Sequence, residues 1–145
     1  MSTRIKILNA DSDSYQAMMN LEATLQTTSL NNIQKELIKT RASQINQCAF
    51  CLNMHTKDAL KYGESAQRLF LLNAWRETDL FTEEEKIILA MTEEITLISM
   101  KGLTDETYEK ATQYFDEGQI KSIIMAVITI NMWNRIAIST HLQIN

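Results

Sequence analysis

The sequence contains no proline and only three glycines among its 145 residues. Collagen-like, proline-rich and glycine-rich low-complexity chains are therefore excluded. The glycines, Gly63, Gly102 and Gly118, stand between segments whose apolar residues recur at intervals of three and four. This pattern is typical of helices joined by short turns, and it predicts an all-α fold.

The sequence also lacks an excess of basic residues, since its net charge is −4 and its pI is about 5.2. The positive surface that a nucleic-acid partner requires is therefore not expected. No apolar run approaches the roughly 20 residues that cross a bilayer, and residues 1–6 do not read as a signal peptide. We expect a cytoplasmic protein without a nucleic-acid or membrane partner.

The length fits one domain over residues 1–145, built from six or seven helices. Apolar spacing and capping residues predict helices over about 13–25, 31–45, 48–63, 65–75, 82–102, 104–115 and 120–142. Asp11 or Ser12 is the expected N-cap of the first helix. The last segment is apolar on nearly every side, which predicts a buried helix.

The sequence has only two cysteines, Cys48 and Cys51, and His55 follows four residues after the second. If Cys48 begins a helix, all three side chains share one face. A helix N-terminus and a nearby imidazole both lower the pKa of a thiol and so favour the nucleophilic thiolate. Two thiols one turn apart can also close a disulfide, so the spacing indicates thiol redox chemistry.

These residues allow two other interpretations. The cysteines could be buried side chains that act as small hydrophobic residues. A zinc site would need a distant fourth ligand such as His141, and ligands spaced along one helix do not converge easily on a tetrahedral ion. We therefore expect neither a bound cofactor nor a metal. The residues alone leave the nucleophile open, because the helix N-terminus favours Cys48 and His55 favours Cys51.

Segments 36–38, 41–55, 74–77, 82–96 and 130–135 carry a resemblance to a known family. They are similar to the AhpD-like alkylhydroperoxidase branch of the carboxymuconolactone decarboxylase superfamily. The resemblance covers most of the chain from about residue 30 onward. It implies an all-α fold that assembles into homo-oligomers, commonly dimers, trimers or hexamers.

The resemblance also implies a role for each site residue. In the family's peroxidases the second cysteine attacks the peroxide and the first resolves the product, so Cys51 is the expected peroxidatic residue and Cys48 the resolving one. Their proton-relay glutamate precedes the first cysteine by twelve residues, which corresponds to Glu36, and their histidine corresponds to His55. The implied function is a thiol-dependent peroxidase that takes a small hydroperoxide and an external dithiol reductant.

One position departs from the family's pattern. The best-studied members carry a histidine directly before the second cysteine, and this sequence has Phe50 there. A disulfide-exchange or redox-sensing protein that uses the same cysteine pair is therefore the alternative function. The lactone decarboxylase chemistry of other members is disfavoured, because they generally lack the pair. A non-enzymatic oligomeric scaffold or small-ligand binder with structural cysteines is the remaining alternative.

Overall fold

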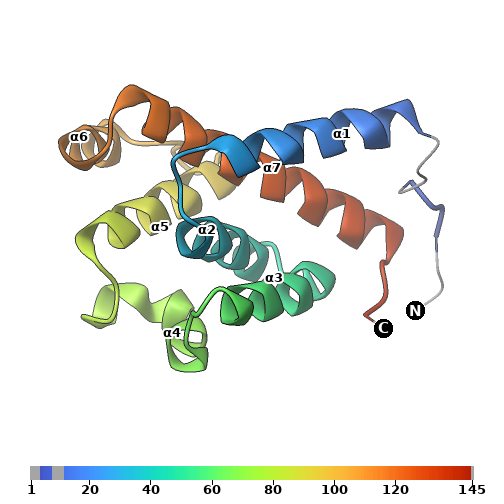
Figure 1. Cartoon of the computed structure of the whole chain (residues 1–145), viewed down its shortest axis with the longest axis horizontal. Helices are drawn as coiled ribbons and strands as arrows, with labels where there is room; N and C mark the ends of the chain where they lie inside the picture. Colours follow the sequence, from blue (N-terminus) through green and yellow to red (C-terminus); the bar gives the residue numbers. More distant parts are fainter. Residues whose placement is uncertain (1–3, 8–11, 145) are drawn as a thin grey trace.

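The computed structural model describes residues 4–7 and 12–144, and in these ranges it contains seven α-helices, two short 3-10 helices and no strand. The predicted all-α fold is therefore confirmed (Figure 1). The elements in chain order are α1 (Asp13–Thr24), η1 (Leu25–Thr27), α2 (Asn32–Ile45), α3 (Ala49–Lys61), α4 (Ala66–Leu71), η2 (Leu72–Glu77), α5 (Glu83–Thr96), α6 (Asp105–Tyr114) and α7 (Glu117–Thr140).

Each α-helix begins at a side chain that accepts a hydrogen bond from a backbone N–H of the first turn, which satisfies a donor that the helix itself leaves free. Six of these caps are of the ordinary kinds, Ser12, Asn31, Ser65, Thr82, Thr104 and Asp116. Helix α3 differs, because its cap is Cys48. Ser12 thus confirms one expected cap of the first helix, and the alternative, Asp11, lies outside the described residues.

Helix α2 lies in the middle of the molecule and packs against α3, α5 and α7 (Figure 1). Its apolar side chains Leu37, Ile38 and Ala42 are fully buried. Ile38 and Ala42 belong to a core cluster with the buried side chains of α5 and α7, such as Met91 and Val127. Burial of this apolar surface is the main stabilising term of the fold, and it fixes the face of α2 that carries Glu36 next to α3.

Helix α7 starts earlier than expected, at Glu117, because Asp116 and Gln119 form a capping box. By length and composition it is the one described helix that could cross a membrane, with a mean hydropathy of 1.3. Half of the 18-residue stretch with this hydropathy is buried in the fold, and core helices of soluble proteins have the same length and composition. The expected burial on all sides is wrong, since Ile128 and Ile138 are 44% and 43% exposed.

Helix α5 ends at Thr96 and does not continue to Gly102 as predicted. The reason is a tertiary contact: the carboxylate of Glu94 accepts hydrogen bonds from the backbone N–H and the hydroxyl of Thr104, at 2.8 Å and 3.1 Å. The chain must therefore reverse between the two helices. Gly102 takes a φ of +64° in this turn, a conformation that favours glycine.

The fourth predicted helix is also divided. It ends at Leu71 and continues as the 3-10 helix η2, in which Ala74 has a non-helical φ of −117°. A 3-10 helix has about three residues per turn, so the apolar face shifts relative to an α-helix. Leu69, Leu72 and Trp75 are buried in this segment, whereas Phe70 of α4 is 80% exposed.

Candidate active site

The two cysteines lie at the start of α3. The Cys48 sulfur accepts a hydrogen bond from the backbone N–H of Cys51, with 3.3 Å between Sγ and N. The two residues form a disulfide, and their Cα atoms are 5.4 Å apart, inside the usual range of about 4.4–6.8 Å. Both side chains are almost completely buried. The pair therefore occupies the positive end of the helix, where a thiolate is stabilised.

The turn before the cysteines fixes their position. Gln47 takes a left-handed φ of +57°, and the backbone N–H of Cys48 returns to the carbonyl of Ser43 at 3.0 Å. The side-chain amide of Asn46 donates to Asn131 and Asn134 of α7, at 2.9 Å each. These contacts attach the start of α3 to both α2 and α7.

One turn along α3, His55 meets Glu36 of α2. The distance between His55 Nδ1 and Glu36 Oε2 is 2.9 Å, and both side chains are buried. When the carboxylate accepts the Nδ1 proton, Nε2 becomes the basic nitrogen of the ring. We call Glu36 and His55 the relay pair, because a carboxylate and an imidazole in contact can exchange a proton.

Further charged groups extend the relay pair. Lys39 Nζ lies 3.8 Å from Glu36 Oε1 and 2.8 Å from Glu22 Oε1. The other oxygen of Glu22 accepts a hydrogen bond from the indole N–H of Trp133 at 3.1 Å. Glu36 is thus held on one side by His55 and on the other by the ammonium group of Lys39.

One pocket is lined by the relay pair and a second by Cys48, and Cys51 lines neither of the two. The relay pocket, with a volume of about 410 Å³, is lined by both relay residues and by Asp58 and Trp133. The thiol pocket, of about 240 Å³, is lined by Cys48 and by residues at the end of α7, including His141. Phe50 lines both pockets and so stands in the wall between them.

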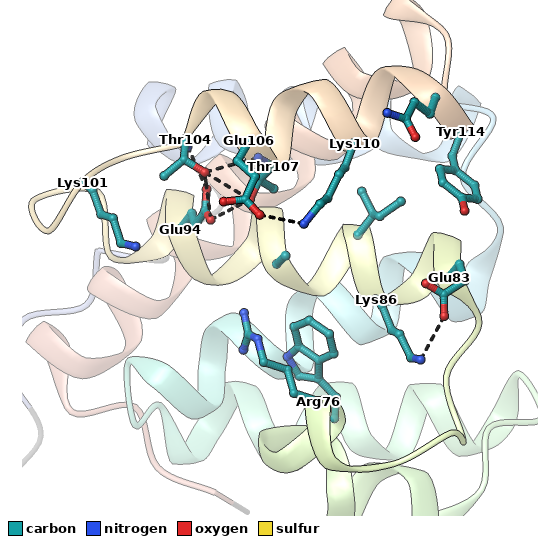
Figure 2. A pocket seen from close by; sticks show the side chains of 14 residues that line it. Arg76, Glu83, Lys86, Glu94, Lys101, Thr104, Glu106, Thr107, Lys110 and Tyr114 are labelled. Atoms are coloured by element: carbon teal, nitrogen blue, oxygen red, sulfur yellow. Dashed lines mark hydrogen bonds and ion pairs between the residues drawn. The ribbon is translucent and has the colours of Figure 1, made fainter.

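A third hollow, the polar cleft of about 580 Å³, lies between η2, α5 and α6 and contains none of the predicted site residues (Figure 2). Its charges are largely paired within the chain, as Figure 2 shows. Lys86 lies 2.9 Å from Glu83, and Lys110 lies 2.8 Å from Glu106. Glu94 accepts hydrogen bonds at the start of α6. The charged side chains of the polar cleft are therefore explained by ion pairs and hydrogen bonds within the chain.

Near the polar cleft, Glu93 of α5 forms a separate ionic cluster. Its Oε1 accepts hydrogen bonds from Arg41 Nε at 2.8 Å and from the indole N–H of Trp75 at 2.9 Å, and Arg76 binds the other oxygen. Burial raises the pKa of Glu93, but the hydrogen bonds from Arg76, Trp75 and Arg41 outweigh it and hold the pKa below its ordinary value of 4.5. Glu93 is thus a fixed carboxylate that joins α2, η2 and α5.

The sequence profile of the carboxymuconolactone decarboxylase family matches residues 12–94, which include both cysteines and the relay pair. The chain belongs to this family. An uncharacterised family relative from Bacillus subtilis, the protein YdfG, is 42% identical over 139 residues, which cover 96% of this chain and 95% of the relative.

Solved structures place this family member in the AhpD-like group. A protein of unknown function from Agrobacterium tumefaciens, provisionally assigned to antioxidant defence as AhpD, has a TM-score of 0.94 and 37% identity, over 99% of each chain. The debrominase Bmp8 has a TM-score of 0.81 at 18% identity, over 92% of this chain and 72% of the debrominase. The latter similarity concerns the fold alone, and it shows that this fold serves more than one chemistry.

The structure of this AhpD-like protein places the four predicted site residues in two pairs, one joined by a disulfide and one by a hydrogen bond. Cys48 is bonded to Cys51, and Glu36 contacts His55. Sequence reasoning missed Asp58, although it follows His55 by three residues and so shares its helix face. His141, which a zinc site at the cysteines would need as its fourth ligand, lines the thiol pocket and not the relay pocket.

Proposed function

We propose that this protein is a thiol-dependent peroxidase of the alkylhydroperoxide reductase type. The observation that carries the proposal is the disulfide between Cys48 and Cys51 at the start of α3, one turn before a histidine that is bound to Glu36. Such an arrangement holds two sulfurs that can be oxidised together and a group that can move the required protons.

The first step oxidises Cys51. Its thiolate attacks the terminal oxygen of the hydroperoxide, the O–O bond breaks, and a sulfenic acid forms on Cys51. The alkoxide that leaves takes a proton supplied through the relay pair and departs as the alcohol. His55 is suited to this role because it lies four residues after Cys51 on α3 and receives its orientation from Glu36.

The second step closes the disulfide. The Cys48 thiolate attacks the sulfur of the Cys51 sulfenic acid, and the hydroxyl group leaves as water after it gains a proton. The Cys48 sulfur already accepts the N–H of Cys51, and a charge at this N-cap position is stabilised by the helix. An external dithiol then restores both thiols by two exchange reactions and is itself oxidised to a disulfide.

The two pockets suit the two substrates of this cycle. The relay pocket carries the proton-transfer groups and is the proposed entrance for the hydroperoxide. The thiol pocket carries Cys48 and is the proposed entrance for the dithiol. Phe50 separates them, so peroxide and reductant would approach the buried sulfurs from different sides.

The test uses purified protein, an organic hydroperoxide and a dithiol donor. We expect Cys51→Ser to abolish turnover, and we expect Cys48→Ser to accumulate a sulfenic acid that a dimedone-type reagent traps in about one equivalent. Unchanged turnover in Cys51→Ser would reject the mechanism. Trapping in Cys51→Ser in place of Cys48→Ser would reverse the roles of the two cysteines.

The second candidate is a disulfide-exchange or redox-sensing protein, and the apolar side chain of Phe50 beside the pair favours it. Such a protein exchanges disulfides rapidly with a dithiol but forms little sulfenic acid with peroxide. Measurement of the reduction potential together with sulfenic acid trapping distinguishes the two functions.

We also propose that the protein acts as a cytoplasmic homo-oligomer. The support is an apolar groove between α5 and α7, lined by Ile95, Ile98, Leu103, Ile124, Ile128 and Met132. An exposed apolar surface of this kind is typical of a protein contact, and light scattering measures the resulting mass.

A further inference from the structure

Three potential metal ligands converge in the relay pocket. Glu36 comes from α2, and His55 and Asp58 come from α3. One ligand atom of each residue lies within 4.8 Å of the corresponding atoms of the other two. Glu36 and His55 are buried and Asp58 is half-buried, so the set extends from the interior of the pocket toward its edge.

The charges around this set favour a cation. Three carboxylates, those of Glu22, Glu36 and Asp58, line the relay pocket, and Lys39 is the buried ammonium group among them. Lys39 is nearer to Glu22, at 2.8 Å, than to Glu36, at 3.8 Å. Among the described residues, one other cation forms an ion pair with a proposed ligand. It is Lys61, which contacts Asp58, and its side chain is 74% exposed. The pocket therefore carries excess negative charge when His55 is neutral.

We propose that Glu36, His55 and Asp58 bind a divalent cation of the zinc class. Zinc sites that keep a position for water have three protein ligands, and both imidazole nitrogen and carboxylate oxygen bind zinc, at distances of about 2.0–2.2 Å. Two ligands of one tetrahedral ion are separated by roughly 3.3 Å at these bond lengths. The present 2.9 Å between His55 Nδ1 and Glu36 Oε2 therefore needs only a small adjustment, which the rotatable Glu36 side chain can make.

The imidazole distinguishes this site from one for magnesium or calcium, which prefer oxygen ligands alone. The disulfide distinguishes it from a cysteine site, because Cys48 and Cys51 are bonded to each other and provide no thiolate. The ion would thus bind the oxidised protein, without the sulfurs.

Occupation of this site has a consequence that rests on the proposed peroxidase function. The ion would engage Glu36 and His55, the same groups that are proposed to move protons. Metal binding and proton transfer would then exclude each other, so zinc would inhibit peroxide reduction.

The binding experiment uses the oxidised protein, in which a thiol assay first confirms that no free cysteine remains. Cobalt(II) is titrated in a buffer without chelators, its visible absorption is recorded, and zinc is then added. We expect about one cobalt ion per chain, a spectrum typical of four or five ligands, and displacement by zinc. Asp58→Asn should weaken binding about tenfold or more, whereas the matched variant of an exposed carboxylate, Asp79→Asn, should bind as the wild type does.

The proposal is overturned if the oxidised wild type binds no cobalt, or if Asp58→Asn and Asp79→Asn bind equally. A second measurement follows one turnover of the prereduced protein, freed of dithiol, with peroxide and with or without zinc. In the reduced protein zinc can also bind the free thiols, and this inhibition affects the wild type and Asp58→Asn equally. We therefore expect zinc to inhibit the wild type more strongly than it inhibits Asp58→Asn. Cobalt binding without any peroxide reaction would reject the proposed function and support the metal site. A peroxide reaction without cobalt binding would support the proposed function and reject the metal site.

Discussion

Glu93 and Glu36 are two largely buried carboxylates on neighbouring helices, but their partners differ in kind. The side chains are 13% and 7% exposed, respectively. Glu93 is bound by two guanidinium groups and an indole N–H, from Arg41, Arg76 and Trp75. Glu36 is bound by the imidazole of His55, with the ammonium of Lys39 farther away.

This difference in partners distinguishes a carboxylate with a structural role from one that is suited to proton transfer. Guanidinium and indole groups keep their protons at every pH at which the protein is folded, so they favour the ionised form of Glu93. An imidazole gains and loses a proton near neutral pH, so its carboxylate partner can take part in proton transfer. Glu36 also lines a pocket, which gives a substrate access to it.

The largest expected effect is on activity, from Glu36→Gln. The amide preserves the shape and can still contact His55, but it cannot take up or release a proton at ordinary pH. We expect the peroxide-dependent rate to fall by about 100-fold or more, the usual contribution of general acid–base catalysis. Steady-state kinetics measure this rate, and a thermal melt provides the control. A loss of activity that merely follows a loss of folded protein would show that Glu36 is structural, like Glu93.

The opposite result is expected for Glu93→Gln. The neutral amide weakens three hydrogen bonds from charged or buried donors, so the free energy of unfolding should fall by about 1–3 kcal/mol. The rate per folded molecule should not change, because Glu93 does not line the relay pocket or the thiol pocket. Denaturant unfolding and the peroxide assay on the same samples measure both quantities.

The pH dependence sharpens the result for Glu93. Because the folded-state pKa lies below the ordinary value of 4.5, the carboxylate stabilises the fold above that value, and the contribution is lost as the pH falls through the lower folded-state pKa. The stability difference between the wild type and Glu93→Gln should therefore be constant above about pH 5.5 and shrink in acid. A difference that stays constant into acid would contradict the assigned cause.

The smallest effect is expected from Trp75→Phe, which removes one donor to Glu93 and keeps an aromatic ring beneath Arg76. The guanidinium of Arg76 lies 4.0 Å from the Trp75 ring. We expect a loss of about 1.5 kcal/mol in the free energy of unfolding, the low end of the range for a hydrogen bond to a charged group, because both arginines still bind the carboxylate. Denaturant unfolding measures it. A loss as large as that of Glu93→Gln would mean that the indole N–H, and not the arginines, holds the carboxylate.

The sequence predicted much of this fold because most helix starts depend on local chemistry. The Thr82–Glu85 capping box and the Asn31 cap, for example, act within one turn. The end of α5 could not be predicted, because it depends on the hydrogen bond between Glu94 and Thr104, which joins two helices.

The site was predictable to different degrees. Spacing along one helix was enough to associate Cys51 with His55. Only the family resemblance pointed to Glu36, because nothing local in α2 distinguishes this carboxylate from a solvated one. The contact of Lys39 with Glu22 and the approach of Asp58 to Glu36 depend on how the helices pack, and no sequence pattern encodes that packing. The catalytic roles themselves stay predictions.

The cysteine cap of α3 has a mechanical consequence. The helix turn itself sets the 5.4 Å between the two Cα atoms, so the sulfurs can bond or separate by side-chain rotation alone. Since the loop between them is only a few residues long, the bond constrains the unfolded chain less than the bond of a longer loop would. Opening of the disulfide therefore requires no refolding of the chain beyond the start of α3.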